Sequence, residues 1–138
     1  MKEHQIQIRV RYSETDQMSV VYHGNYMPYF EMGRVEALRK LGIPYSEWEA
    51  QGILLPVVSL STRFLLPLRY DEVVTMKTTF TELTRATLFF DYELYNESKQ
   101  LTTTAQVTLV CLDANRKKPR SVPDSLPQSL KPYEIETL

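Results

Sequence analysis

Apolar residues occupy every second position at the start of the chain, where Ile6, Ile8 and Val10 alternate with glutamine and arginine. A period of two is typical of a strand with one buried face, so the pattern predicts a strand over residues 5–12. The segment 13–25 is polar and aperiodic, and it links this strand to the next predicted element.

A helical period follows the link. Asn25 is of a type that caps helices, and Pro28 falls in the first turn, where its missing N–H costs nothing. Gly42 can close the helix, and Pro44 prevents its continuation, so we expect a helix over residues 26–41. Its apolar positions recur at intervals of three, four and seven: Met27, Phe30, Ala37, Leu38 and Leu41.

From Leu54 onward the period returns to two. Four runs are rich in Val, Thr, Phe, Tyr and Leu, and they lie near 56–66, 72–82, 86–96 and 101–112. The links between them are short, which favours antiparallel neighbours and makes the last three strands a meander. The order of strand, long helix and four strands predicts an α+β fold, with a central helix wrapped by a curved, mostly antiparallel five-stranded sheet.

Glycine in the middle of a helix costs about 1 kcal/mol relative to alanine. We therefore interpret Gly33 as a point where the helix closely approaches the sheet. Residues 45–51 are expected to form a short second helix that ends at Gly52. The proline-rich segment 116–138 is expected to be an extended tail on the surface of a single domain spanning residues 1–138.

The composition excludes several classes of protein. Lys and Arg (16) nearly balance Asp and Glu (17), and the net charge of −1 argues against a nucleic-acid-binding protein. The only cysteine, Cys111, lies in an apolar run; we expect an inert thiol, with neither a disulfide nor a Cys-rich zinc site. The chain has no apolar signal-peptide stretch and no window of about 18 apolar residues that would span a membrane. We therefore expect a cytoplasmic protein.

The densest polar chemistry lies in residues 12–26, where a carboxylate, a histidine and several tyrosines precede a helix N-terminus. The unpaired N–H groups of a helix start suit an oxyanion, and Asp16 could attack the adjacent carbon or activate a water for it. Each residue also has a structural interpretation. Asp16 can form a turn, His23 can pack at the helix entrance, and Tyr12 can be an aromatic residue at a strand end.

This segment resembles a known active site. The run Tyr12-x-Glu14-Thr15-Asp16-x-Met18-x-Val20-Val21-Tyr22-His23-Gly24-Asn25-Tyr26 is similar to the active-site segment of the 4-hydroxybenzoyl-CoA thioesterase family of hot-dog-fold proteins, especially the bacterial short acyl-CoA thioesterases associated with the Tol–Pal cluster. The resemblance covers nearly the whole chain. It implies a hot-dog fold, hydrolysis of acyl-CoA without a metal or redox cofactor, and a homodimer or homotetramer with its active site at the subunit boundary.

The resemblance also assigns roles to residues. It implies that Asp16 is the catalytic nucleophile or general base and that backbone N–H groups near His23 and Gly24 polarise the thioester carbonyl. Tyr12 and His23 match positions that orient the carboxylate or the substrate. Met18-Ser19 stands where many relatives carry glycine, which leaves the acyl preference open.

A basic segment follows the last strand. Charge runs are usually solvated surface, but the phosphates of CoA need cationic partners, and the resemblance places a CoA-contacting loop here. We expect at least one of its four cations to contact a CoA phosphate: Arg116, Lys117, Lys118 or Arg120.

Two other functions remain open. One is a non-catalytic acyl-CoA or acyl-carrier sensor, which would bind without releasing thiol. The other is a hot-dog dehydratase, which would need His23 to meet a helical acid, with Glu31 as the candidate.

Overall fold

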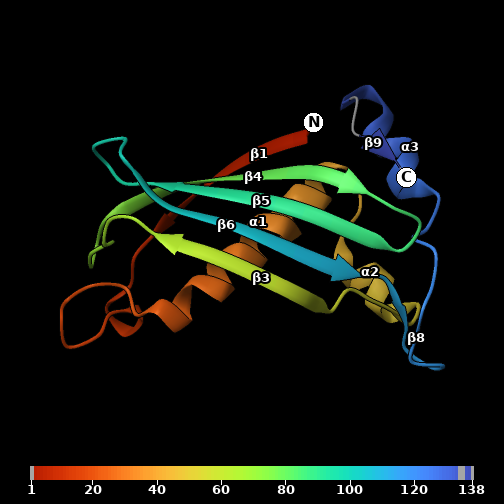
Figure 1. Cartoon of the computed structure of the whole chain (residues 1–138), viewed down its shortest axis with the longest axis horizontal. Helices are drawn as coiled ribbons and strands as arrows, with labels where there is room; N and C mark the ends of the chain where they lie inside the picture. Colours follow the sequence, from red (N-terminus) through yellow and green to blue (C-terminus); the bar gives the residue numbers. More distant parts are fainter. Residues whose placement is uncertain (1, 134–135, 138) are drawn as a thin grey trace.

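The computed structural model describes residues 2–133 and 136–137. Five long strands form an antiparallel sheet in the order β1-β4-β5-β6-β3 (Figure 1). Their bounds are β1 Lys2–Arg9, β3 Val57–Phe64, β4 Val73–Leu83, β5 Thr87–Tyr95 and β6 Leu101–Val110. A short strand, β9 (Glu136–Thr137), runs parallel to the end of β4. The four runs and the meander β4-β5-β6 are confirmed.

The first strand lies earlier in the chain than expected. It ends at Arg9, and residues Tyr12–Glu14 form a 3₁₀ turn, η1, in place of the predicted end of the strand. Isoleucine and valine alternation still marks the buried face, since Ile8 and Val10 are in the core.

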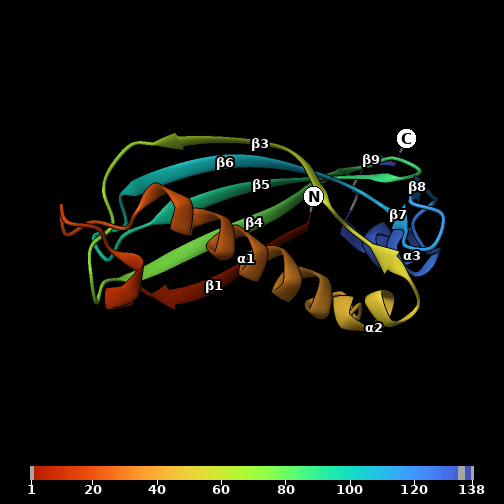
Figure 2. The ribbon, with the colours of Figure 1, turned by 90° about the horizontal axis from the view of Figure 1, so that it is seen from below.

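One long helix, α1 (Tyr26–Lys40), lies across the concave face of the curved sheet, as Figure 2 shows. Its last residue is Lys40, two residues before Gly42 at φ +82°, and α2 (Tyr45–Ala50) ends two residues before Gly52 at φ +80°. Both glycines occupy the left-handed region that favours glycine, so the predicted helix ends are confirmed. The buried face differs in detail: Tyr29 is fully buried, whereas Met27 is 55% exposed.

Gly33 lies where α1 approaches the sheet. A Cβ at this position would lie 2.4 Å from the Oγ1 of Thr78 on β4 and 3.3 Å from the ring of Tyr92 on β5. The predicted close contact is therefore present. The core fills the space between helix and sheet with the inward residues of the two central strands: Val74, Met76, Thr78 and Phe80 of β4, and Leu88, Phe90, Tyr92 and Leu94 of β5.

The expectation of an extended tail over 116–138 is wrong for the described part of that segment. Residues Lys118–Pro119 (β8) pair with β7 (Leu112–Asp113), which also pairs with β2 (Ile53–Leu54). A helix, α3 (Ser125–Leu130), and a 3₁₀ turn, Lys131–Tyr133 (η3), follow. Leu126 and Leu130 are four residues apart and share one helix face, and both are fully buried. Pro127 is tolerated because it lies in the first turn.

Across residues 2–133 and 136–137, none of the helices combines the length and hydrophobicity needed to cross a bilayer.

Candidate active site

Asp16 lies at the start of a tight turn in the link between β1 and α1. Its N–H donates to the carbonyl of Val20 (2.9 Å), and its carbonyl accepts from the N–H of Ser19 (3.0 Å). The Oδ1 atom accepts the N–H of Met18 at 2.8 Å. Ser19 adopts φ +64°, a left-handed conformation that glycine adopts more readily than other residues. The turn fixes Asp16 in a half-buried position.

Asp16 and His23 line one pocket of about 300 Å³. The other walls are apolar and come from the link, the first helical residue and the end of β3: Val20, Val21, Tyr26, Phe64, Leu65, Leu66 and Pro67. The link is tied to this wall by the N–H of Val21, which donates to the carbonyl of Leu68 at 2.8 Å. The fold therefore brings a carboxylate and the start of the helix to the same hollow.

The helix begins through a 3₁₀ turn, η2 (His23–Asn25), that runs directly into α1. The N–H of Asn25 donates to the carbonyl of Tyr22 (2.8 Å), and the N–H of Tyr26 donates to that of His23. Within the described residues, the N–H groups of His23 and Gly24 have no acceptor, as expected for the first donors of a helix. These are the two N–H groups for which the resemblance implies a role as oxyanion donors.

Asn25 does not cap the helix with its side chain, contrary to the expectation. Its backbone is already helical, and its Nδ2 donates to the carbonyl of Glu14 at 2.8 Å instead. Asn25 thus connects the helix to the link.

Tyr12 lies apart from the His23 pocket. Its side chain is 77% exposed and packs edge-on against Tyr70, with the ring centroids 5.6 Å apart. Both tyrosines line a second, larger hollow of about 500 Å³, which Asp16 also borders. Tyr12 therefore shares this second hollow, and not the His23 pocket, with Asp16.

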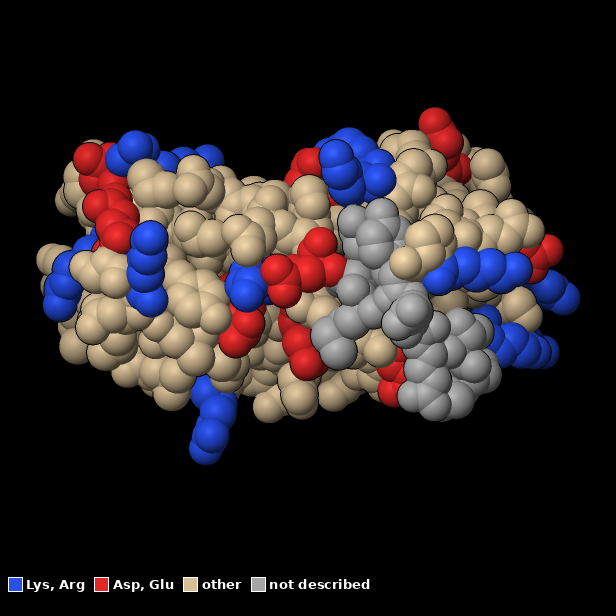
Figure 3. Space-filling view, turned by 90° about the horizontal axis from the view of Figure 1, so that it is seen from above, with Lys and Arg blue, Asp and Glu red and all other residues tan. Residues whose placement is uncertain are grey.

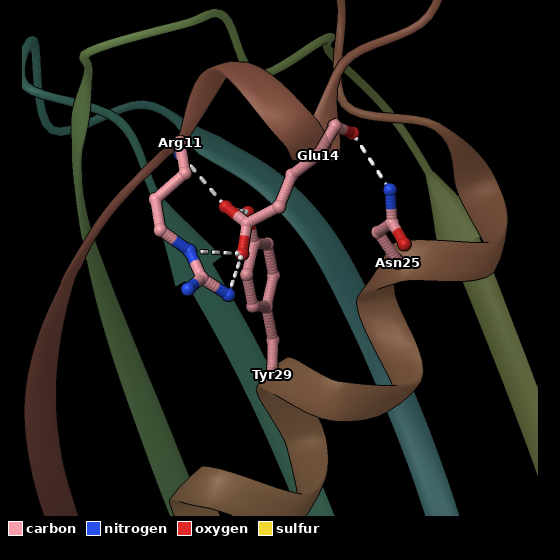
Figure 4. A network of polar contacts seen from close by, with 4 residues as sticks. All are labelled: Arg11, Glu14, Asn25 and Tyr29. Carbon is pink, nitrogen blue, oxygen red and sulfur yellow. Dashed lines mark hydrogen bonds and ion pairs between the residues drawn. The ribbon is translucent and has the colours of Figure 1, made fainter.

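Glu14 is a feature that the sequence analysis did not assign. Its side chain is buried and accepts hydrogen bonds from Arg11 and from the hydroxyl of Tyr29 on α1 (Figure 4). Burial alone raises the pKa of the Glu14 carboxyl, but the hydrogen bonds from the Arg11 N–H, the Tyr29 hydroxyl and the Arg11 guanidinium outweigh it and hold that pKa below its ordinary value. Burial, together with the neighbouring Glu14 carboxylate, raises the pKa of Tyr29.

The family of the chain follows from a comparison with known protein families. The model of the thioesterase-like superfamily matches residues 10–130. The chain belongs to the thioesterase-like superfamily. Its structure is the α+β hot-dog fold: a central helix wrapped by an antiparallel sheet.

Individual members are similar over almost their full length. The putative acyl-CoA thioesterase YneP of Bacillus subtilis is 34% identical over 93% of both chains, and the acyl-CoA thioester hydrolase YbgC of Escherichia coli O6:H1 is 30% identical over 90% of this chain and 92% of its own. Among solved structures, a DHNA-CoA thioesterase from Staphylococcus aureus superposes with a TM-score of 0.88 at 34% identity, covering 100% of both chains.

In this thioesterase-like chain the basic segment lies far from Asp16. Figure 1 places the link at one end of α1 and β8 at the other, and 15 helical residues span about 22 Å. Arg116, Lys117 and Lys118 are exposed, and Arg116 pairs with Asp113 at 3.4 Å. Lysine and arginine side chains project from this end of the molecule in Figure 3. The segment does not border the Asp16 pocket of its own chain.

Glu31 also lies outside the Asp16 pocket. It borders a hollow of about 220 Å³ between α1 and β3, together with Arg34, Leu60 and Val107. His23 and Glu31 line different hollows, so a single chain does not bring them together as the acid–histidine pair that a dehydratase would need.

Proposed function

We propose that the protein hydrolyses acyl-CoA thioesters to a free acid and CoA in the pocket between Asp16 and the start of α1. Membership of the thioesterase-like superfamily and the thioesterase names of full-length relatives support the reaction class. One observation carries the assignment of the site: Asp16 and His23, whose N–H has no acceptor within the described residues, line one pocket with an apolar wall, and the N–H of Gly24 follows directly in the chain.

The reaction follows from this arrangement. The thioester carbonyl oxygen accepts hydrogen bonds from the N–H groups of His23 and Gly24, which stabilise the negative charge that develops on it. Asp16 then acts in one of two ways. It takes a proton from a water that attacks the carbonyl carbon, or it attacks that carbon itself and water cleaves the resulting anhydride. In both routes the C–S bond breaks, the sulfur leaves as the thiol of CoA, and one water supplies the added oxygen and protons. No metal or redox cofactor is required.

The test is the release of free thiol from a panel of acyl-CoAs by wild type and Asp16→Asn. The substitution keeps the size of the side chain and removes its charge, so we expect kcat to fall by about 100-fold or more. Asp124→Asn, an exposed aspartate beside α3, is the matched control and should hydrolyse at the wild-type rate. Equal rates for Asp16→Asn and wild type would remove Asp16 from the mechanism, and tight acyl-CoA binding without thiol release would favour a sensor.

We further propose that the active form is a homodimer, or a tetramer built from it, joined through β3. This strand is an edge of the sheet, and it exposes apolar side chains: Val57 is 45% exposed, Val58 57% and Phe64 53%. An open apolar edge is a liability that proteins usually cover. Light scattering should give a multiple of the single-chain mass, and Val58→Lys should lower it to the monomer. The matched control is Gln7→Lys on the opposite edge strand, which should leave the mass of the assembly unchanged. A monomeric, active wild type would contradict the proposal.

A two-fold axis through β3 also gives the basic segment a role. The Asp16 link and β8 lie at opposite ends of the molecule but on the same side of it, the side of β3 (Figure 1). Antiparallel pairing of two β3 strands would therefore bring the β8 end of one copy beside the Asp16 end of the other. We propose that Arg116, Lys117, Lys118 or Arg120 of the second copy then contacts the CoA phosphates. Replacing all four by alanine should raise KM for acyl-CoA and leave KM unchanged for an acyl-pantetheine, which lacks those phosphates. Equal effects on both substrates would contradict this role.

A further inference from the structure

Glu14 is a charged residue in the core, and its carboxylate is fully engaged. It is 8% exposed. Its Oε1 accepts the N–H of Arg11 and the hydroxyl of Tyr29, both at 2.8 Å. Its Oε2 accepts Nε and Nη2 of Arg11, at 3.1 and 3.0 Å (Figure 4). A buried carboxylate is costly unless such donors compensate it, so this arrangement defines one position for the side chain.

The backbone of Glu14 makes a second set of connections. Its N–H donates to the carbonyl of Arg11 at 3.0 Å. Its carbonyl accepts the N–H of Tyr22 at 3.0 Å and the Nδ2 of Asn25 at 2.8 Å. Residue 14 is therefore joined to Arg11 just after the first strand, to the residue before His23, and to Asn25 and Tyr29 at the start of α1.

These connections surround the reacting groups. Asp16 follows Glu14 by two residues, and His23 follows Tyr22 directly. The bond from Tyr22 to the Glu14 carbonyl therefore sets the distance between the stretch that carries Asp16 and the stretch that carries the N–H groups of His23 and Gly24. A displacement of about 1 Å between groups that must flank one carbon can cost about 100-fold in rate.

We propose that Glu14 is a positioning residue for the hydrolysis: by joining Arg11 to Tyr29 through its side chain, it holds Asp16 and the His23–Gly24 N–H groups at the separation that the thioester requires. This inference rests on the proposed function of Asp16. Glu14 itself does not touch the substrate, because it lies outside the pocket that Asp16 and His23 line.

The experiment separates positioning from support of the fold. Glu14→Gln retains the size of the side chain but places an amide where two Arg11 donors now meet an oxygen. Tyr29→Phe removes a single hydrogen bond and keeps the ring. Both variants are compared with Leu130→Ala, which destabilises the fully buried face of α3 at the other end of the molecule. Thiol release is measured at a temperature where circular dichroism shows every variant folded, kcat is calculated per folded protein, and KM is taken from the same substrate titrations.

Positioning predicts that kcat falls by about 10- to 100-fold in Glu14→Gln, and by less in Tyr29→Phe, while KM stays within a factor of about two. Leu130→Ala should lose stability and keep its kcat. A wild-type kcat in folded Glu14→Gln, or a rise in KM with unchanged kcat, would overturn the proposal. If Glu14→Gln does not fold, the same criteria apply to Tyr29→Phe.

Asp16→Asn in the same series distinguishes the two levels of the argument. If Asp16→Asn is inactive while Glu14→Gln and Tyr29→Phe retain their kcat, the positioning role alone is wrong. If Asp16→Asn itself hydrolyses at the wild-type rate, the proposed function of Asp16 fails and the positioning role fails with it.

Discussion

Gly33→Ala tests whether the close approach of α1 to the sheet outweighs the higher helix propensity of alanine. In an exposed helix this substitution would stabilise the protein by about 1 kcal/mol. Here the new Cβ would lie 2.4 Å from Thr78 Oγ1 and 2.8 Å from Met76 Cε. The methyl group of Met76 ends a flexible side chain and can shift, whereas the Thr78 oxygen lies one bond from Cβ on a central strand. Overpacking of this kind costs about 1–3 kcal/mol, and the gain in helix propensity offsets about 1 kcal/mol of it, so we expect a net destabilisation of up to about 2 kcal/mol.

The measurement is urea unfolding at one fixed protein concentration, followed by the fluorescence of buried Trp48. Lys40→Ala, an exposed site in the same helix, should change the free energy of unfolding by less than about 0.5 kcal/mol. Thr78 Oγ1 has no hydrogen-bond partner within the described residues, so Thr78→Ala removes the obstacle without breaking a bond. The double variant Gly33→Ala/Thr78→Ala should then be at least about 0.5 kcal/mol more stable than the sum of the single changes predicts. A Gly33→Ala protein more stable than wild type would refute the reasoning.

Three further outcomes are expected. Ser19→Gly relieves a left-handed conformation that costs about 1–2 kcal/mol, although the greater entropy of glycine in the unfolded chain offsets part of this gain. Thermal melts should show the free energy of unfolding raised by about 0.5–1 kcal/mol, and no gain would mean that the turn is unstrained. Because the pKa of Glu14 lies below its ordinary value of 4.5 in the folded state, its ionisation stabilises the fold above about pH 5 and this contribution is lost as the pH falls through the folded pKa. The stability gap between wild type and Glu14→Gln should therefore narrow from pH 6 to pH 3, and a constant gap would contradict the assignment. Cys111 is fully buried, and burial raises the pKa of its thiol, so a disulfide-exchange reagent should label it only when the protein unfolds. Rapid labelling of the folded protein would contradict that burial.

Most of the fold could be predicted from the sequence because its long elements repeat a hydrophobic pattern over several periods. The four β-runs and the long helix each span several periods, and Gly42 and Gly52 mark helix ends through a conformation that other residues avoid. The segment after residue 116 was misjudged for the opposite reason. Its prolines dominate the composition, while the helix α3 shows only one apolar pair, Leu126 and Leu130, which is too short a pattern to outweigh them.

The site could be predicted only in part. Asp16 and the helix start are adjacent to one another through a short link, so their meeting at one pocket could be expected from the motif. The inward orientation of the Glu14 side chain could not be predicted, because a buried glutamate and a solvated one are the same letter in a sequence. The one available signal was its position within the motif, three residues after Arg11. The residue type of Asn25 predicts a helix cap, but its side chain donates to the Glu14 carbonyl instead, because the preceding 3₁₀ turn already makes residue 25 helical.

Two acids that differ by two positions thus acquire different chemistry from their surroundings. A carboxylate offers about four acceptor sites. Those of Glu14 are occupied by four donors, two of them on a guanidinium, so the ionised group has no free lone pair with which to take a proton from an attacking water or to attack a carbonyl carbon. Asp16 accepts one neutral N–H from Met18 within the described residues, and it borders two hollows. Of the two, only Asp16 retains acceptor capacity toward a bound thioester, and this asymmetry is the physical reason to place the reaction there and the positioning at Glu14.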